Sequence, residues 1–264
     1  MAFILILNSL NKKRSELWHQ VNEWFEEKGV PPLEKYRLRH LSANLNVCVY
    51  PKPLMDDYLR LCPLGDEWHV LNHSLRKSSE NFQLPAGFKR ENEKLIYLSL
   101  GSIGSNIPSL MSRLVKLLAN CKHKIIVVKG KFHDQLELAE NMWGEPFLPQ
   151  LEIIPLVNLV ITHGGNNTFI ETLYFGKPMI VMPLFSDQPD NAQRAVESKV
   201  GVFFDPFTVE EKQLLKAIDE LLNNSEMAQR LEKISKEIRE SQSMDVLVKK
   251  IEKIATNPKI PSIM

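Results

Sequence analysis

Residues 160–191 of this chain read "VITHGGNNTFIETLYFGKPMIVMPLFSDQPDN". The segment begins as a continuous apolar strand, crosses two adjacent glycines and continues with apolar residues at helical spacing. It then returns to an apolar run, "PMIVMP" (178–183), and ends in an Asp-Gln pair. Uninterrupted apolar strands are typical of parallel sheets that are covered on both faces. The order strand, helix, strand therefore predicts a parallel α/β unit.

The same alternation continues on both sides of this segment. It predicts the fold class α/β, with a doubly wound, Rossmann-like parallel sheet. The further strands that we expect are "LIYLSL" (95–100), "KIIVVKG" (124–130), "NLVITH" (158–163) and "GVFF" (201–204). The helical stripes are Leu110, Leu114, Leu117 and Leu118 in one helix, and Ile170, Leu173 and Tyr174 in the next.

The chain before this region is expected to hold a strand, a helix, a second strand and a linker. Residues 1–14, "MAFILILNSLNKKR", are predicted to form a buried strand, because the apolar run is too short for a signal peptide and the basic cluster follows it. Residues 15–28 show helical spacing and are followed by Gly29. "NVCVY" (46–50) predicts a strand, and the polar, aperiodic residues 74–94 predict a linker.

After the last strand the sequence predicts helices to the end. Thr208 and Glu211 have the spacing of a capping box. Residues 233–254 are expected to form further helices with solvated Lys/Glu faces. The apolar stripe that follows the capping box is Leu214, Leu215, Ile218 and Leu222.

Composition excludes several classes of protein. The 264 residues carry a formal net charge of +1, so a general nucleic-acid binder is not expected. Cys48, Cys62 and Cys121 lack CxxC spacing, which argues against a disulfide framework or a zinc site and favours a reducing, cytoplasmic compartment. No stretch approaches the roughly 20 apolar residues of a membrane span, so no membrane anchor is expected.

Two glycine-containing loops follow predicted strands, "GSIGSN" (101–106) and "HGGNNT" (163–168). Each leads into a helix whose first N–H groups lack intrahelical partners and attract phosphate. Gly101, Gly164 and Gly165 let the backbone approach a ligand closely. Because ligands bind beyond the carboxyl ends of parallel strands, two such loops suit a diphosphate.

Neither loop matches a standard phosphate motif, since GxGxxG and GxxxxGK[ST] are both absent. Taken alone, "GSIG" (101–104) is equally consistent with an ordinary strand-to-helix turn. His163 alone would be read as a structural histidine. Their combination with Glu171 and the pair "DQ" (187–188) favours a ligand site.

At residues 95–205 the sequence resembles the UDP-glycosyltransferases, the GT-B family of metal-independent sugar transferases. The resemblance rests on several motifs in the family's order: "YLSLGS" (97–102), "FLPQ" (147–150), "THGGNNTFIE" (162–171) and "GKPMIVMPLFSDQPDNA" (176–192). It implies that UDP-sugar is a co-substrate and that no metal or other cofactor is needed. Residues 1–80 would hold a partial acceptor domain, and residues 81–264 the donor-binding domain.

The resemblance also implies roles for residues on the phosphate side. Gly101 and Ser102 lie beside the diphosphate, and His163 donates to a phosphate oxygen. Helix starts and imidazole suit phosphate chemically. The phosphate cradle is completed by Gly165, Asn167 and Thr168.

On the sugar and uridine side, the resemblance implies that Glu171 accepts from the ribose hydroxyls and that Asp187 and Gln188 hold the transferred sugar. Gln150 borders the uridine, and Phe147 faces the uracil where many relatives carry Trp. Phenylalanine can stack but offers less area and no N–H. The alternatives are a surface acid at Glu171, a helix cap at Asp187 and a turn residue at Gln150.

The family reaction transfers a sugar to an acceptor with inversion. Its base is a histidine near the start of the amino-terminal domain. We assign no catalytic residue, because His19 shares an amphipathic helix with Trp18 and because His40, His69 and His73 are expected in loops. We expect transfer of a hexose, glucose by default, to a small lipophilic acceptor, with slow turnover by this chain alone. The alternatives are a nucleotide-sugar-binding subunit whose partner supplies the acceptor domain, and a GT-B epimerase.

Overall fold

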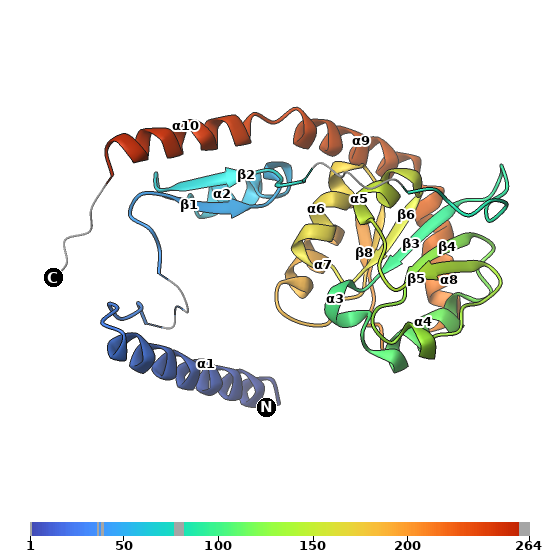
Figure 1. Ribbon diagram of the computed structural model, residues 1–264, viewed down its shortest axis with the longest axis horizontal. Helices are drawn as coiled ribbons and strands as arrows, with labels where there is room; N and C mark the ends of the chain where they lie inside the picture. Colours follow the sequence, from blue (N-terminus) through green and yellow to red (C-terminus); the bar gives the residue numbers. More distant parts are fainter. Residues whose placement is uncertain (1, 36, 38–39, 77–81, 259–264) are drawn as a thin grey trace. The chain divides into compact units, whose positions relative to one another are not determined.

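The computed structural model describes residues 2–35, 37, 40–76 and 82–258, and Figure 1 shows their helices and strands. The chain divides into two compact units. The larger comprises residues 47–64 and 70–249, and the smaller comprises residues 1–46, 65–69 and 250–264. The predicted boundary between an acceptor part (residues 1–80) and a donor-binding domain (residues 81–264) was drawn by function. The two compact units do not test it, and it stays a prediction.

A six-stranded sheet forms the centre of the larger unit. Its strand order is β5-β4-β3-β6-β7-β8, and every neighbouring pair is parallel. This confirms the predicted α/β class. The order reverses between β3 and β6, where ligands bind in such sheets. The strands are β3 (Leu95–Ser99), β4 (Lys124–Val128), β5 (Met142–Glu145), β6 (Leu159–Thr162), β7 (Met179–Val181) and β8 (Gly201–Phe203).

Helices connect these strands and continue after the last one. The expected helices between β3 and β4 and between β6 and β7 are present, and so are those at the carboxyl end. The α-helices are α3 (Gly101–Gly104), α4 (Pro108–Leu118), α5 (Gln150–Ile153), α6 (Asn166–Tyr174), α7 (Gln188–Glu197), α8 (Glu211–Leu222), α9 (Ser225–Arg239) and α10 (Ser243–Thr256). Single 3-10 turns are η1 (Lys52–Leu54), η2 (His133–Gln135) and η3 (Ile154–Leu156).

Strand β3 shows why the apolar runs are continuous. Successive side chains of a strand point to opposite faces. Ile96 and Leu98 accordingly join the larger apolar cluster, which includes side chains of α4 and α8. Leu95 and Tyr97 join a smaller cluster with Ile153 of α5. Both faces of β3 are therefore buried, which fixes the strand against slipping and places its carboxyl end at the loop that begins with Gly101.

Strand β5 was not expected from the sequence. "MWGE" (142–145) mixes apolar and polar residues, because β5 is an edge strand with one neighbour. Gly144 is required there: a Cβ at this position would lie 2.1 Å from the carbonyl oxygen of Val127 on β4. The glycine therefore marks a close approach between two strands, which is one of the positional meanings of glycine in a sheet.

The capping box predicted at Thr208 and Glu211 is wrong by two residues. Helix α8 is capped by Glu210, and the Glu210 N–H donates to Oε1 of Gln213 at 3.2 Å. Thr208 instead lies in the preceding turn, where its N–H donates to the carbonyl of Asp205. The predicted stripe is nevertheless at helical spacing on α8, and Leu214 and Ile218 are fully buried.

The strand predicted for residues 1–14 is also wrong, within the described residues that begin at Ala2. Helix α1 (Ala2–Glu27) contains that segment together with the helix predicted for residues 15–28. No glycine or proline interrupts the chain between Ala2 and Glu27. The helical pattern therefore extends towards the amino end, because nothing in the sequence breaks it.

In the smaller unit the segment that follows α1 folds back along this helix. The Asn22 side-chain oxygen accepts from the Leu33 N–H at 2.6 Å, and the Trp18 indole donates to the carbonyl of Glu34 at 2.9 Å. The rings of Phe25 and His40 stack with centroids 5.4 Å apart. Side chains of α1 thus supply the partners for backbone groups of the returning segment.

A two-stranded sheet joins β1 (Asn46–Val49) and β2 (Trp68–Leu71). Strand β1 confirms the prediction for "NVCVY". Strand β2 was not predicted, and it contains His69, which was expected in a loop. The described residues of the expected linker at 74–94 contain no helix or strand; residues 77–81 lie outside the described part.

Candidate functional site

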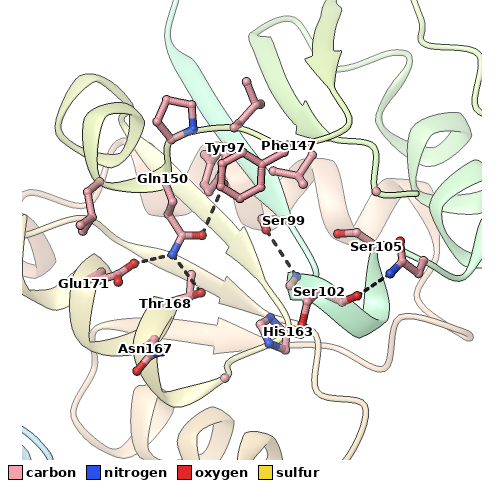
Figure 2. Close-up of a pocket in the computed structure, with 18 of the residues that line it drawn as sticks. Tyr97, Ser99, Ser102, Ser105, Phe147, Gln150, His163, Asn167, Thr168 and Glu171 are labelled. Carbon is pink, nitrogen blue, oxygen red and sulfur yellow. Dashed lines mark hydrogen bonds between the residues drawn. The ribbon is translucent and has the colours of Figure 1, made fainter. Parts of the chain in front are cut away.

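A cleft of about 1110 Å³ lies in the larger unit at the carboxyl ends of β3, β4 and β6. Figure 2 shows many of the residues that line it. The structure brings ten of the eleven predicted site residues to this cleft and leaves out Gln188. The ten are Gly101, Ser102, Phe147, Gln150, His163, Gly165, Asn167, Thr168, Glu171 and Asp187.

His163 lies between the two glycine loops. A Cβ on Gly101 would lie 2.5 Å from Cε1 of His163 and 2.6 Å from its Nε2, and a Cβ on Gly165 would lie 2.4 Å from Nε2. The imidazole therefore occupies space that only glycine leaves free on both sides. The sequence interpretation assigned that space to a ligand; the structure shows that the glycines first make room for His163.

The environment of His163 favours a neutral imidazole. Burial lowers its pKa below the ordinary value, against the opposing charge of Asp187 and a hydrogen bond to the backbone of Ser99. Thr162 Oγ1 lies 3.3 Å from Nδ1 of His163 and accepts from the Gly164 N–H at 3.2 Å. The Ser99 backbone accepts the single N–H of the neutral imidazole. An anionic oxygen at the other ring nitrogen would meet an N–H once the ring is protonated, a form that the charge of the anion favours.

The start of α6 faces the cleft without a capping side chain. Gly165 is its N-cap residue and offers no side-chain hydrogen bond to the first turn. Asn166, Asn167 and Thr168 of that turn all line the cleft. Backbone N–H groups at a helix start carry partial positive charge and bind anions. The end of the cleft with His163 is therefore suited to phosphate.

Gln150 is the centre of a polar network at the other end of the cleft (Figure 2). Its Nε2 donates to Oγ1 of Thr168 at 3.1 Å and to Oε2 of Glu171. Its Oε1 accepts from the hydroxyl of Tyr97 at 3.3 Å. Gln150 is therefore more than a turn residue, since it joins β3, α5 and α6 through its amide.

Glu171 is a hydrogen-bond acceptor in the cleft, and the pKa of its carboxyl is raised. Burial raises the pKa of its carboxyl, while the hydrogen bond from Gln150 and the charge of Arg76 lower it. Because the side chain lines the cleft and is only partly buried, it is not the plain surface acid of the alternative interpretation. A carboxylate held in this way suits two adjacent hydroxyl groups.

Phe147 and Asp187 lie at the cleft as predicted, and Gln188 does not. Phe147 is 76% exposed, so one ring face is open to a planar ligand. Asp187 is the N-cap residue of α7 but makes no side-chain capping bond. Gln188 is 3% exposed, and its Oε1 accepts from the N–H groups of Leu184 and Phe185.

Tyr97, Lys131 and Arg76 are among the polar residues that line the cleft and to which the sequence analysis assigned no role. Tyr97 was placed in an apolar strand and in the motif "YLSLGS" (97–102), without a role of its own. Lys131 follows the carboxyl end of β4, so the rule used for the two glycine loops could have found it. Arg76 lies in the expected linker, and no local pattern marks it.

The described residues contain no group of three or more His, Cys, Asp or Glu side chains that could hold a metal ion. Among the helices in the described ranges, none is both long and apolar enough to cross a membrane. His163 is the one histidine that lines the cleft, so the catalytic base stays unassigned.

The fold and the site together define a class of protein. A parallel sheet with its cleft at the switch point between β3 and β6 is the arrangement of a Rossmann-like donor domain in the GT-B fold. The structure of the glycotransferase of kitacinnamycin is similar, with a TM-score of 0.73 at 24% identity over 92% of this chain and 66% of that one. The calicheamicin glycosyltransferase CalG4 has a TM-score of 0.69 at 17% identity, over 90% of this chain and 58% of that one.

Sequence comparison extends this result. The model of the family "UDP-glucoronosyl and UDP-glucosyl transferase" matches residues 7–254, and the chain belongs to that family. The uncharacterized UDP-glucosyltransferase YdhE of Bacillus subtilis (strain 168) is 28% identical over 87% of this chain and 58% of its own length. UDP-glucuronosyltransferase 2C1 of Oryctolagus cuniculus is 32% identical over 55% of this chain and 29% of its own length. The chain thus spans little more than half of YdhE and less of the rabbit enzyme.

Proposed function

We propose that the cleft binds a UDP-sugar and that the protein acts in the transfer of its hexose, glucose in the first instance, to a small lipophilic acceptor. The observation that carries this proposal is the pairing of two chemistries in one cleft. His163 and the open start of α6 suit a diphosphate, and the Glu171–Gln150 network suits a ribose. Titration with UDP-glucose tests it: saturable binding is expected, and no binding would refute it.

Each part of the donor has a matching group. The phosphates lie against His163 and the α6 N–H groups, and the ribose hydroxyls donate to Glu171. The uracil stacks on Phe147, and Asp187 accepts from the sugar hydroxyls. Gln188 supports the sugar site through the backbone that precedes Asp187, because its own oxygen is occupied by the N–H groups of that loop.

Transfer requires that the negative charge developing on the departing UDP be stabilised. The His163 N–H and the start of α6 lie in place before the reaction and supply that stabilisation without reorganisation. The acceptor must also be held in line and lose its proton to a base. We propose that the groups that bind the acceptor and take its proton lie outside this cleft. In the alternative form of the proposal, a partner protein supplies them.

A cytoplasmic location is also part of the proposal. Cys62 is exposed and Cys121 is buried, and both carry free thiols. Free thiols persist in reducing compartments and are oxidised or paired in most secreted proteins. An exposed thiol such as Cys62 therefore fits the cytoplasm.

The first prediction concerns His163. His163→Ala should weaken UDP binding by about 1–3 kcal/mol, or roughly 5–150-fold, because a desolvated hydrogen bond to a charged phosphate is lost. Isothermal titration measures the change. His123→Ala is the matched control, since His123 is also partly buried but does not line the cleft. An affinity equal to that of the unmodified protein would show that His163 is structural.

The second prediction is that UDP binding needs no divalent metal. Helix starts and His163 supply the positive field, and the described residues hold no cluster with metal-ligand character. The affinity for UDP should be the same in EDTA and in excess Mg²⁺. A collapse of binding in EDTA, reversed by adding the metal, would contradict the proposal.

The third prediction concerns pH. Ionised Glu171 can accept from both ribose hydroxyls, whereas protonation removes part of this acceptor capacity. Burial raises the pKa of Glu171 above the ordinary value of 4.5. UDP binding should therefore weaken as the pH falls through this raised pKa, earlier than for an ordinary carboxyl. Protonation of His163 acts in the opposite direction, because it strengthens phosphate binding. Glu171→Gln separates the two: it should remove the loss at low pH, and a loss that persists would assign the effect to another group.

A further inference from the structure

We propose that Tyr97 is a positioning residue for ribose recognition: its hydroxyl fixes the orientation of the Gln150 amide, which in turn holds the carboxylate of Glu171. The inference rests on the proposed function, because it concerns the nucleotide that the cleft binds. Tyr97 lies on β3 and does not need to touch the ribose. It acts through Gln150, whose side chain lies between Tyr97 and Glu171 (Figure 2).

Tyr97 is held rigidly. Its side chain is 1% exposed and packs in the smaller apolar cluster with Ile153 and Leu148. Burial raises the pKa of its phenol, so the hydroxyl keeps its proton and remains a donor. A tyrosine buried in this way usually directs its O–H at a partner. The acceptor here is Oε1 of Gln150, 3.3 Å away, and the side chain of Ser99 makes a second hydrogen bond with the same hydroxyl.

The amide of Gln150 has two possible orientations, and its neighbours select one. An ionised Glu171 can only accept, so Nε2 must face Oε2 of Glu171, and the same nitrogen donates to Thr168. Oε1 must then face the opposite side, where the Tyr97 hydroxyl donates to it. With all three contacts made, the two Nε2 hydrogens of Gln150 bond to Thr168 and to Glu171. Glu171 is held through its Oε2.

Removing the tyrosine hydroxyl would leave this arrangement incomplete. Oε1 of Gln150 would lose its donor in a partly buried place, where an unpaired acceptor is costly. The amide would then be free to turn, and the Glu171 carboxylate would lose its fixed neighbour. Arg76 is the charged group that also faces Glu171, and it would remain in place. The expected defect is thus loss of ribose discrimination and a Glu171 that protonates at higher pH.

The test compares UDP with 2′-deoxy-UDP by isothermal titration of the full chain. The unmodified protein should prefer UDP. Tyr97→Phe keeps the ring and its packing, and it should reduce this preference by at least about fivefold while leaving the affinity for 2′-deoxy-UDP within about twofold. Tyr50→Phe is the matched control, because Tyr50 is another largely buried tyrosine that packs in the core but does not line the cleft. It should leave the preference unchanged.

Two further measurements separate positioning from general damage. Gln150→Ala and the double variant Gln150→Ala/Tyr97→Phe should show the same reduced preference. Tyr97 acts only through Gln150, so its hydroxyl has no further effect once the Gln150 amide is removed. In Tyr97→Phe the preference for UDP should disappear at a higher pH than in the unmodified protein. An unchanged preference in Tyr97→Phe, or an equal loss of affinity for both nucleotides, would overturn the role of Tyr97 and leave the proposed function intact. Failure of the unmodified protein to bind UDP would refute the proposed function and this inference with it.

Discussion

Gly165→Ala is expected to weaken UDP binding by roughly 2–4 kcal/mol, or about 30–1,000-fold, more than removal of the His163 side chain itself. The φ angle of Gly165 is −59°, so its backbone accepts alanine without strain. The effect comes from the new methyl group, which would lie 2.4 Å from Nε2 of His163. The ring must move out of its place between Gly101 and Gly165, and we expect it to enter the space proposed for the phosphates.

A double variant tests this cause. In a His163→Ala background the collision is absent, so Gly165→Ala should add little to the loss of affinity. Isothermal titration of the two single variants and the double variant gives the coupling between the positions. Full additivity would show that the methyl group acts on the phosphate directly and not through His163. An unchanged affinity of Gly165→Ala would contradict the position of His163 in the structure.

Arg194→Ala is expected to lower the free energy of unfolding by about 2–3 kcal/mol. Arg194, on α7, is 9% exposed; its guanidinium forms a fork on Asp57, with distances of 2.6 and 3.0 Å. Its Nε donates to the carbonyl of Leu54, and its Cζ lies 4.8 Å from the ring centre of Tyr58. The Arg194 side chain thus links residues 52–61 to α7 through hydrogen bonds, an ion pair and a cation–π contact.

The expected loss stays below that of a fully buried ion pair because Asp57 is half exposed and can be hydrated again. Urea or thermal unfolding measures it. Arg230→Ala is the control: Arg230 also donates to a backbone carbonyl, that of Lys199, but at an exposed position, and its loss should stay within about 0.5 kcal/mol. If Arg194→Ala lowers the free energy of unfolding as little as Arg230→Ala does, the Arg194 contacts contribute no net stability.

The sequence predicted those parts of the fold that are buried on both sides. Strands β3, β4, β6 and β7 are continuous apolar runs because neighbours cover both faces. The edge strand β5 has no such run, and "MWGE" (142–145) could not be recognised without its partner β4. Helix α1 was missed at its start because an apolar run of this length is compatible with strand and helix alike.

The candidate site was predicted largely from motifs that lie within short loops. His163, Glu171 and Gln150 each belong to such a motif. Their contacts are long-range, because Gln150 bonds to Tyr97 and Glu171, which lie 53 and 21 residues away in the sequence. Arg76 and Lys131 come from distant segments, so only the topology brings them to the cleft. The sequence also could not show that Gln188 points into the protein, because the turn that buries it depends on the backbone of Leu184 and Phe185.

We propose that one cleft binds a nucleoside diphosphate mainly through its phosphates. Parallel isothermal titrations of the unmodified protein with UDP and with uridine test this most directly, in EDTA to exclude metal bridging. UDP should bind with clearly higher affinity, because only UDP reaches His163 and the start of α6. Equal affinity for UDP and uridine would contradict the account.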